Sequence, residues 1–104
     1  MSVLKRIEDW FSRNCNGHWE VYYGISIDTL DTPGWVVDIP LFETKLEYEQ
    51  FDNVDIFRSD SNWVRCTLKK GVFRGTGGPR NLEEILEIFW DWAHRSQASS
   101  APQI

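Results

Sequence analysis

The chain has 104 residues, a formal net charge of −5 at pH 7 and six Trp residues. This length supports one domain with a single core. The acidic balance argues against nucleic acid as a direct ligand, because phosphate binding needs a basic face, and it leaves room for a basic protein partner. No apolar run is long enough for a membrane span, and no signal-peptide core is present, so we expect a cytoplasmic protein that does not bind membranes.

The first half of the chain predicts a helix followed by two strands. Apolar residues fall on one stripe over residues 3–13, which indicates an amphipathic helix. Every second residue over 19–27 is apolar, which is typical of a half-buried strand. Residues 32–35, Thr-Pro-Gly-Trp, predict a type II turn in which Gly34 supplies the positive φ. The alternation resumes over residues 35–41 and predicts a second strand.

The second half predicts a hairpin, a short strand and a helix. Residues 43–53 fit either a short strand or an irregular acidic loop. Residues 54–58 and 63–68 form the two arms of the expected hairpin, and residues 72–75 form a last strand. Asn81, with Glu84 at capping-box spacing, predicts the start of the second helix.

These elements predict an α+β fold. An antiparallel sheet of about five strands, with the N-terminal and C-terminal helices packed on one face, would bury the apolar stripes of both helices. The opposite face of the sheet is then partly open. We expect a single domain over residues 1–95 and a disordered tail over residues 96–104, which are rich in Ala, Ser, Gln and Pro.

Several separated blocks, in order, resemble the Immunity protein 53 family of bacterial polymorphic toxin systems. They are the opening Leu4-x-x-Ile-x-x-Trp-Phe, then Trp-Glu, Tyr-Gly-Ile-Ser-Ile and Thr-Leu-Asp-x-Pro-Gly-Trp, and finally residues 73–86. The resemblance covers about residues 4–92 and departs from the family pattern at Thr32, where Asn is expected. It implies a small protein, made beside a toxin, that binds the toxin domain tightly and blocks it.

An acidic stretch and outward aromatic residues are the candidate contacts for such a toxin. Residues 28–60 contain nine acidic and two basic residues, a balance of −7, and acidic surface would speed encounter with a basic toxin domain. Trp63 and Arg65 alternate with apolar Val64 and Cys66, so we expect them on the open face. The predicted toxin-binding residues are Trp63, Arg65, Asp28, Asp31, Glu43, Glu47, Glu49, Asp52 and Asp55.

One alternative is a small enzyme or ligand-binding domain with an anion site in the loop over residues 75–81. Backbone amides and two arginines there could hold a phosphate, although the run lacks the spacing and the lysine of a P-loop. The residues of this site would be Arg74, Gly75, Gly77, Gly78 and Arg80.

We expect neither catalysis nor a cofactor. No Ser or Cys lies in a recognisable motif with either histidine, so no nucleophile is assigned. Cys15, His18, Cys66 and His94 contain half of a zinc-site spacing, but the second half is not local and Cys66 is expected to face the core.

Overall fold

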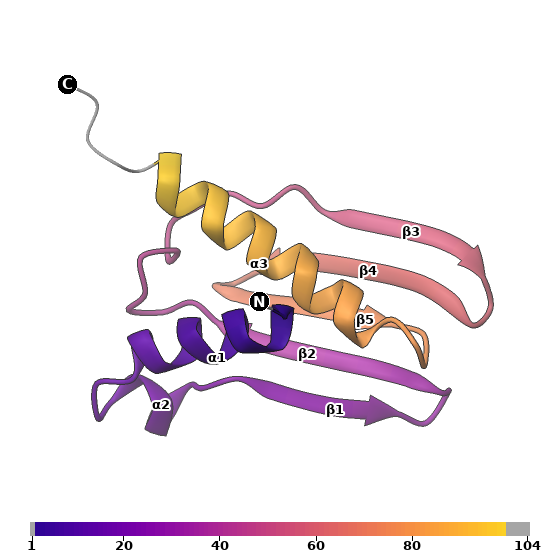
Figure 1. Cartoon of the computed structure of the whole chain (residues 1–104), viewed down its shortest axis with the longest axis horizontal. Helices are drawn as coiled ribbons and strands as arrows, with labels where there is room; N and C mark the ends of the chain where they lie inside the picture. The colour runs from indigo at the N-terminus through magenta and orange to yellow at the C-terminus, as the bar shows by residue number, and fades with distance from the viewer. Residues whose placement is uncertain (1, 100–104) are drawn as a thin grey trace.

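The computed structural model describes residues 2–99, without the side chains of residues 97–99. It contains one five-stranded antiparallel sheet in the order β1-β2-β5-β4-β3, with α1 and α3 on one face (Figure 1). This architecture confirms the predicted fold class. The elements are α1 (Val3–Asn14), α2 (Trp19–Tyr22), β1 (Ser26–Leu30), β2 (Gly34–Pro40), β3 (Val54–Ser59), β4 (Asn62–Lys69), β5 (Val72–Gly77) and α3 (Leu82–Ser99).

The core lies between the two long helices and the sheet, and aromatic rings connect its parts. Trp10 of α1 contacts Phe89 of α3 edge-on, with 5.0 Å between ring centroids, and Phe89 contacts Phe73 of β5 at 5.1 Å. All three side chains are almost completely buried. Edge-to-face pairs stabilise such a core beyond the area they bury, so α1 is held to the sheet largely through α3.

Residues 41–53 connect β2 to β3 without a helix or strand, yet they are firmly attached to the core. Leu41 and Leu46 are buried. Phe51 contacts the ring of Trp92 at 5.2 Å, and the Trp92 indole N–H donates to the carbonyl of Gln50 at 2.8 Å. Trp92 therefore packs beneath this segment and is not available as an exposed contact residue.

The strand predicted over residues 19–27 is wrong in its first half. Residues 19–22 form the short helix α2, and β1 begins only at Ser26. The side-chain oxygen of Asn16 accepts from the backbone N–H groups of His18 and Trp19, at 2.9 and 3.0 Å. Such an Asx turn favours a helical start over an extended chain, and it places Trp19 in the core.

The predicted type II turn at residues 32–35 is also wrong. Leu30 pairs with Gly34, so the connection is Asp31–Pro33 and Gly34 is the first residue of β2. Gly34 is not among the positive-φ glycines, which are Gly17, Gly24 and Gly71. Glycine is needed at position 34 for another reason: a Cβ there would collide with the backbone carbonyl of Gly77.

The predicted hairpin and final helix are confirmed. β3 and β4 pair antiparallel across a short turn, and Lys70 and Gly71, with φ of 52° and 79°, connect β4 to β5. α3 continues to Ser99, whereas the sequence predicted a disordered tail from residue 96. The helix can continue because no Pro interrupts the chain before Pro102; residues 100–104 lie outside the described residues. No helix in residues 2–99 has the length and apolar character needed to cross a membrane.

Candidate functional site

The face of the sheet opposite α1 and α3, called here the open face, carries two aromatic side chains. Phe57 of β3 pairs directly with Trp63 of β4. Val64 and Cys66 are fully buried on the helix side, so the alternation of β4 places Trp63 on the open face, as predicted. Phe57 is 71% exposed and Trp63 is half-buried. Large aromatic side chains in this setting are typical of protein-binding hot spots.

Two ion pairs join neighbouring strands on the open face. Asp38 of β2 lies opposite Arg74 of β5 and accepts two hydrogen bonds from its guanidinium group, at 2.7 and 2.9 Å. These bonds raise the pKa of Arg74. Asp55 of β3 and Arg65 of β4 form a second pair at 3.5 Å. By contrast, Asp28 of β1 has no ion-pair partner among the described residues.

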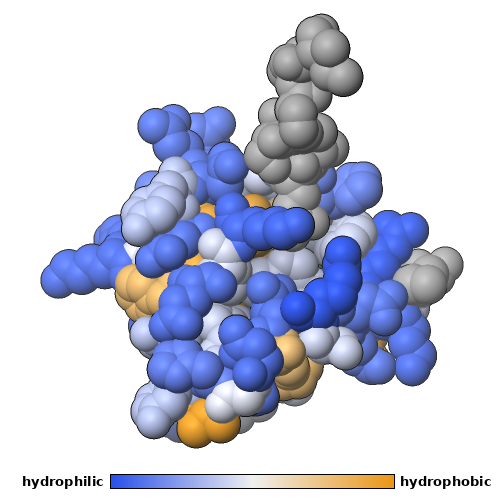
Figure 2. Space-filling view, turned by 90° about the vertical axis from the view of Figure 1, so that its left-hand side faces the viewer, coloured by the Kyte–Doolittle hydropathy of each residue, from blue (hydrophilic) through white to orange (hydrophobic). Residues whose placement is uncertain are grey.

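The acidic stretch is divided between the two ends of the sheet. Asp31 lies in the connection between β1 and β2, whereas residues 43–52 lie beyond the other end of β2 (Figure 1). Figure 2 shows that this second end is mainly hydrophilic, with small separate hydrophobic areas. Glu43 there contacts the Nε2 atom of His18 at 3.2 Å. The structure therefore does not gather the predicted acidic residues into one patch. The members of this second group are Glu43, Glu47, Glu49 and Asp52.

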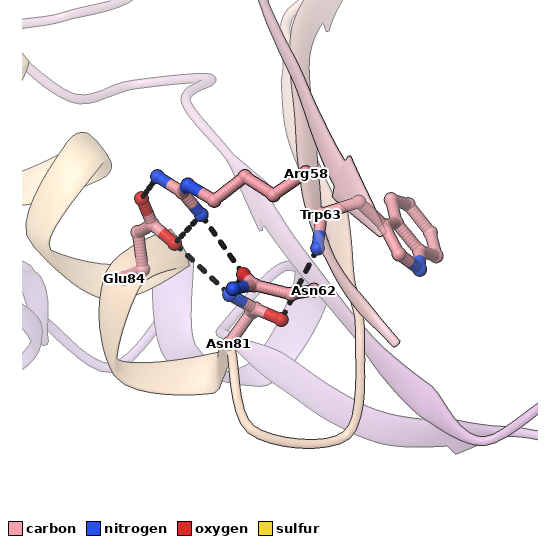
Figure 3. Close-up of polar contacts among 5 residues, drawn as sticks. All are labelled: Arg58, Asn62, Trp63, Asn81 and Glu84. Carbon is pink, nitrogen blue, oxygen red and sulfur yellow. Dashed lines mark hydrogen bonds and ion pairs between the residues drawn. The ribbon is translucent and has the colours of Figure 1, made fainter. Parts of the chain in front are cut away.

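A polar cluster, called here the clasp, ties the β3–β4 hairpin to the start of α3 (Figure 3). Arg58 donates to both carboxylate oxygens of Glu84, at 3.1 and 2.7 Å. The amide nitrogen of Asn81, which is 6% exposed, donates to Asn62 and Glu84, both at 3.0 Å. Its oxygen accepts from the backbone N–H of Trp63 at 3.4 Å. The clasp therefore fixes the backbone that carries Trp63.

Contacts within the clasp favour the ionised forms of Glu84 and Arg58. The hydrogen bonds from Arg58, and secondarily those from Asn81, lower the pKa of Glu84 against the opposing effect of partial burial. The same contact raises the pKa of Arg58. Capping-box spacing correctly marked the start of α3, but the side chain of Asn81 bonds Trp63, Asn62 and Glu84, and nothing local in the sequence pointed to Arg58 and Asn62. Alternation along β3 places Arg58, next to open-face Phe57, on the side of α3.

A model of the Immunity protein 53 family matches residues 4–94. The chain belongs to this family. No curated protein and no solved structure matches it.

In this Immunity protein 53 chain, the glycines of the proposed anion loop serve close packing. A Cβ on Gly75 would collide with the side chain of Ile85 in α3, and one on Gly78 with the carbonyl of Ser61. Arg74 is on the open face with Asp38, whereas Arg80 is exposed at the start of α3. The structure therefore does not bring the two arginines together around the glycines.

The helix side of the chain carries a second hollowed surface. A groove of about 660 Å³ lies between α1 and α3. Trp90 on its wall stacks on His94 at 5.4 Å, and the guanidinium group of Arg6 lies 5.8 Å from the same indole ring. The Trp90 ring is thus in contact with two side chains of the same chain, whereas Phe57 on the open face is largely exposed.

The two cysteines have different surroundings. Cys66 of β4 is fully buried in the core. Burial raises its pKa to about 12, which makes the thiol a poor nucleophile. The thiol of Cys15 donates to the carbonyl of Phe11 at 3.2 Å. Residues 2–99 contain no cluster of three or more His, Cys, Asp or Glu side chains suited to holding a metal.

Proposed function

We propose that this chain is a cytoplasmic immunity protein that neutralises the cognate toxin domain of a bacterial polymorphic toxin system. It acts by protein–protein contact and not by catalysis. Membership of the Immunity protein 53 family supports an immunity role. We place the contact on the open face because Phe57 and Trp63 lie side by side there on neighbouring strands.

The open face has the composition of a contact surface. Phe57 and Trp63 supply apolar area at low conformational cost, since each has only two χ angles. The Asp55–Arg65 pair lies next to them along β3 and β4, and the Asp38–Arg74 pair lies farther along the same face, so these charged groups are already paired. Acidic residues at both ends of the sheet would attract a basic toxin domain and speed its encounter with this face.

Growth rescue tests the function. The toxin domain encoded beside this chain is expressed in cells with and without the chain, and cell survival is scored. We expect the toxin to stop growth and the chain to restore it through a stable complex that co-purifies. Growth arrest despite abundant folded chain, with no complex, would exclude this chain as the immunity protein for that toxin.

Replacing Trp63 by Ala tests the surface. A central aromatic anchor contributes on the order of 2 kcal/mol or more, so we expect about 30-fold weaker binding, mainly through faster dissociation. Trp90→Ala is the matched control, since Trp90 is a half-buried Trp on the helix side. Both variants are first shown to be folded by circular dichroism. Binding lost with Trp90→Ala but kept with Trp63→Ala would place the contact on the helix side instead.

A further inference from the structure

The two edges of the sheet differ in how readily they could receive another strand. β3, at one edge, has a shift of register between Phe57 and Ser59, and Arg58 beside this shift is held by Glu84. Bulges and charged residues of this kind protect an edge from further pairing. β1, at the other edge, pairs with β2 over five consecutive residues without any shift. Four of those five residues are exposed, so nothing described covers the outer side of β1.

The side chains of β1 indicate what a neighbouring strand should contain. Ile27 is 40% exposed although it pairs with buried Val37 on the helix side. Asp28 pairs with Val36 on the open face and has no ion-pair partner among the described residues. A strand added along β1 would bury Ile27 against an apolar side chain. It would also place a side chain opposite Asp28, where a basic residue gives a favourable cross-strand pair.

A second copy of this chain does not fit this edge. Asp28 is the middle residue of β1, so symmetric antiparallel pairing of two copies would set the two Asp28 carboxylates opposite each other. Like charges in directly opposed positions are destabilising, and each copy carries a net charge of −5. The edge therefore favours a foreign, basic strand over self-association.

We propose that β1 binds an extended segment of the toxin domain, which continues the sheet as a sixth strand with Lys or Arg opposite Asp28 and apolar residues on either side. Backbone hydrogen bonds to the outer side of β1 supply affinity in such strand addition, and the alternating side chains supply specificity. This inference rests on the proposed function, because the added strand belongs to the toxin.

Residue-resolved amide hydrogen exchange tests the inference on the unaltered chain. Exchange is compared with and without the toxin domain encoded beside this chain, inactivated by substitution of its own catalytic residue. We expect the amides of β1 that point away from β2 to exchange at least about tenfold more slowly in the complex, because new backbone hydrogen bonds protect them. The amides of α1, on the helix side and outside both proposed contact regions, serve as the internal comparison and should change little.

A charge-reversal variant provides a second test of the inference. We expect Asp28→Lys to weaken toxin binding by about tenfold or more, because it sets two basic residues opposite each other. The matched control Glu87→Lys makes the same change of charge at an exposed position of α3 on the helix side and should weaken binding by less than about threefold. A complex in which β1 exchanges as in the free chain, or in which the two variants weaken binding equally, would overturn the inference while leaving the proposed function intact.

Two further results would also overturn it. If the unaltered chain neither binds the toxin nor rescues growth, the proposed function fails and the added strand fails with it. If the chain alone forms a dimer with protected β1 amides, a second copy and not the toxin occupies this edge.

Discussion

The two faces of the sheet use the same residue types for different purposes. On the helix side, Phe89 contacts both Phe73 and Trp10 edge-on, and all three side chains are almost completely buried. On the open face, Phe57 and Trp63 lie side by side but remain accessible, with the Asp55–Arg65 ion pair next to them. An aromatic residue thus contributes to folding or is available for binding according to whether a helix covers it. The number of aromatic residues in the sequence does not separate these roles, whereas strand phase does.

Matched Phe→Ala substitutions on the two faces give the largest expected difference. Phe89→Ala removes a completely buried ring, and we expect the free energy of unfolding to fall by about 3–5 kcal/mol. Phe57→Ala removes an exposed ring and should cost less than about 1 kcal/mol, mostly through its cross-strand contact with Trp63. Urea denaturation followed by tryptophan fluorescence measures both. Similar losses for the two variants would mean that the open face is as fully packed as the core.

The close approach of β2 to β5 is expected to be nearly as sensitive to substitution as the core. A Cβ on Gly34 would collide with the backbone carbonyl of Gly77, which cannot move aside as a side chain can. We therefore expect Gly34→Ala to lower the free energy of unfolding by about 1–3 kcal/mol, the usual cost of overpacking. Gly34→Asn should be at least as harmful.

The Asn variant separates two explanations for this glycine. If Gly34 were needed for a positive φ, Asn would be tolerated better than Ala, because Asn adopts left-handed backbone conformations more readily. Thermal melts of both variants at neutral pH make the comparison. An Asn variant clearly more stable than the Ala variant would favour the turn explanation over the steric one.

Most of the fold could be predicted from the sequence because most of its elements are locally determined. The apolar stripe of α1, the alternation of β2 and β4 and the paired Asn81 and Glu84 each point to one structure. Residues 19–22 could not be predicted in this way. Their alternating pattern fits a strand, but Asn16 and buried Trp19 favour a helical turn there.

The candidate site could be predicted only in part, for a related physical reason. The outward position of Trp63 follows from strand phase, and the same argument applied to residues 54–58 would have identified Phe57. Which acidic residues lie together depends instead on the path of the chain between strands. β2 separates Asp31 from Glu43 by its whole length, so closeness in sequence does not predict closeness in space here. The clasp depends on contacts between segments distant in sequence, such as Arg58 with Glu84.

The smallest expected effect concerns the clasp, which connects the β3–β4 hairpin to the start of α3. The folded-state pKa of Glu84 is lowered, chiefly by its hydrogen bonds from Arg58. The ionised carboxylate therefore stabilises the fold above its ordinary pKa of about 4.3, and this contribution is lost as pH falls through the lower folded-state pKa. Glu84→Gln cannot ionise and lacks this dependence.

Denaturation of the parent and of Glu84→Gln between about pH 6 and pH 3 measures that contribution. We expect the parent to be the more stable protein at pH 6, and the difference to shrink as the pH falls below about 4.3. Glu20, whose pKa is also lowered by hydrogen bonds from the backbone, titrates in both proteins, so its effect cancels in the difference. A difference that stays constant across this range would mean that Arg58 does not hold Glu84 in its charged form. Asn81 would then supply the remaining polar contacts that tie the hairpin carrying Trp63 to the start of α3.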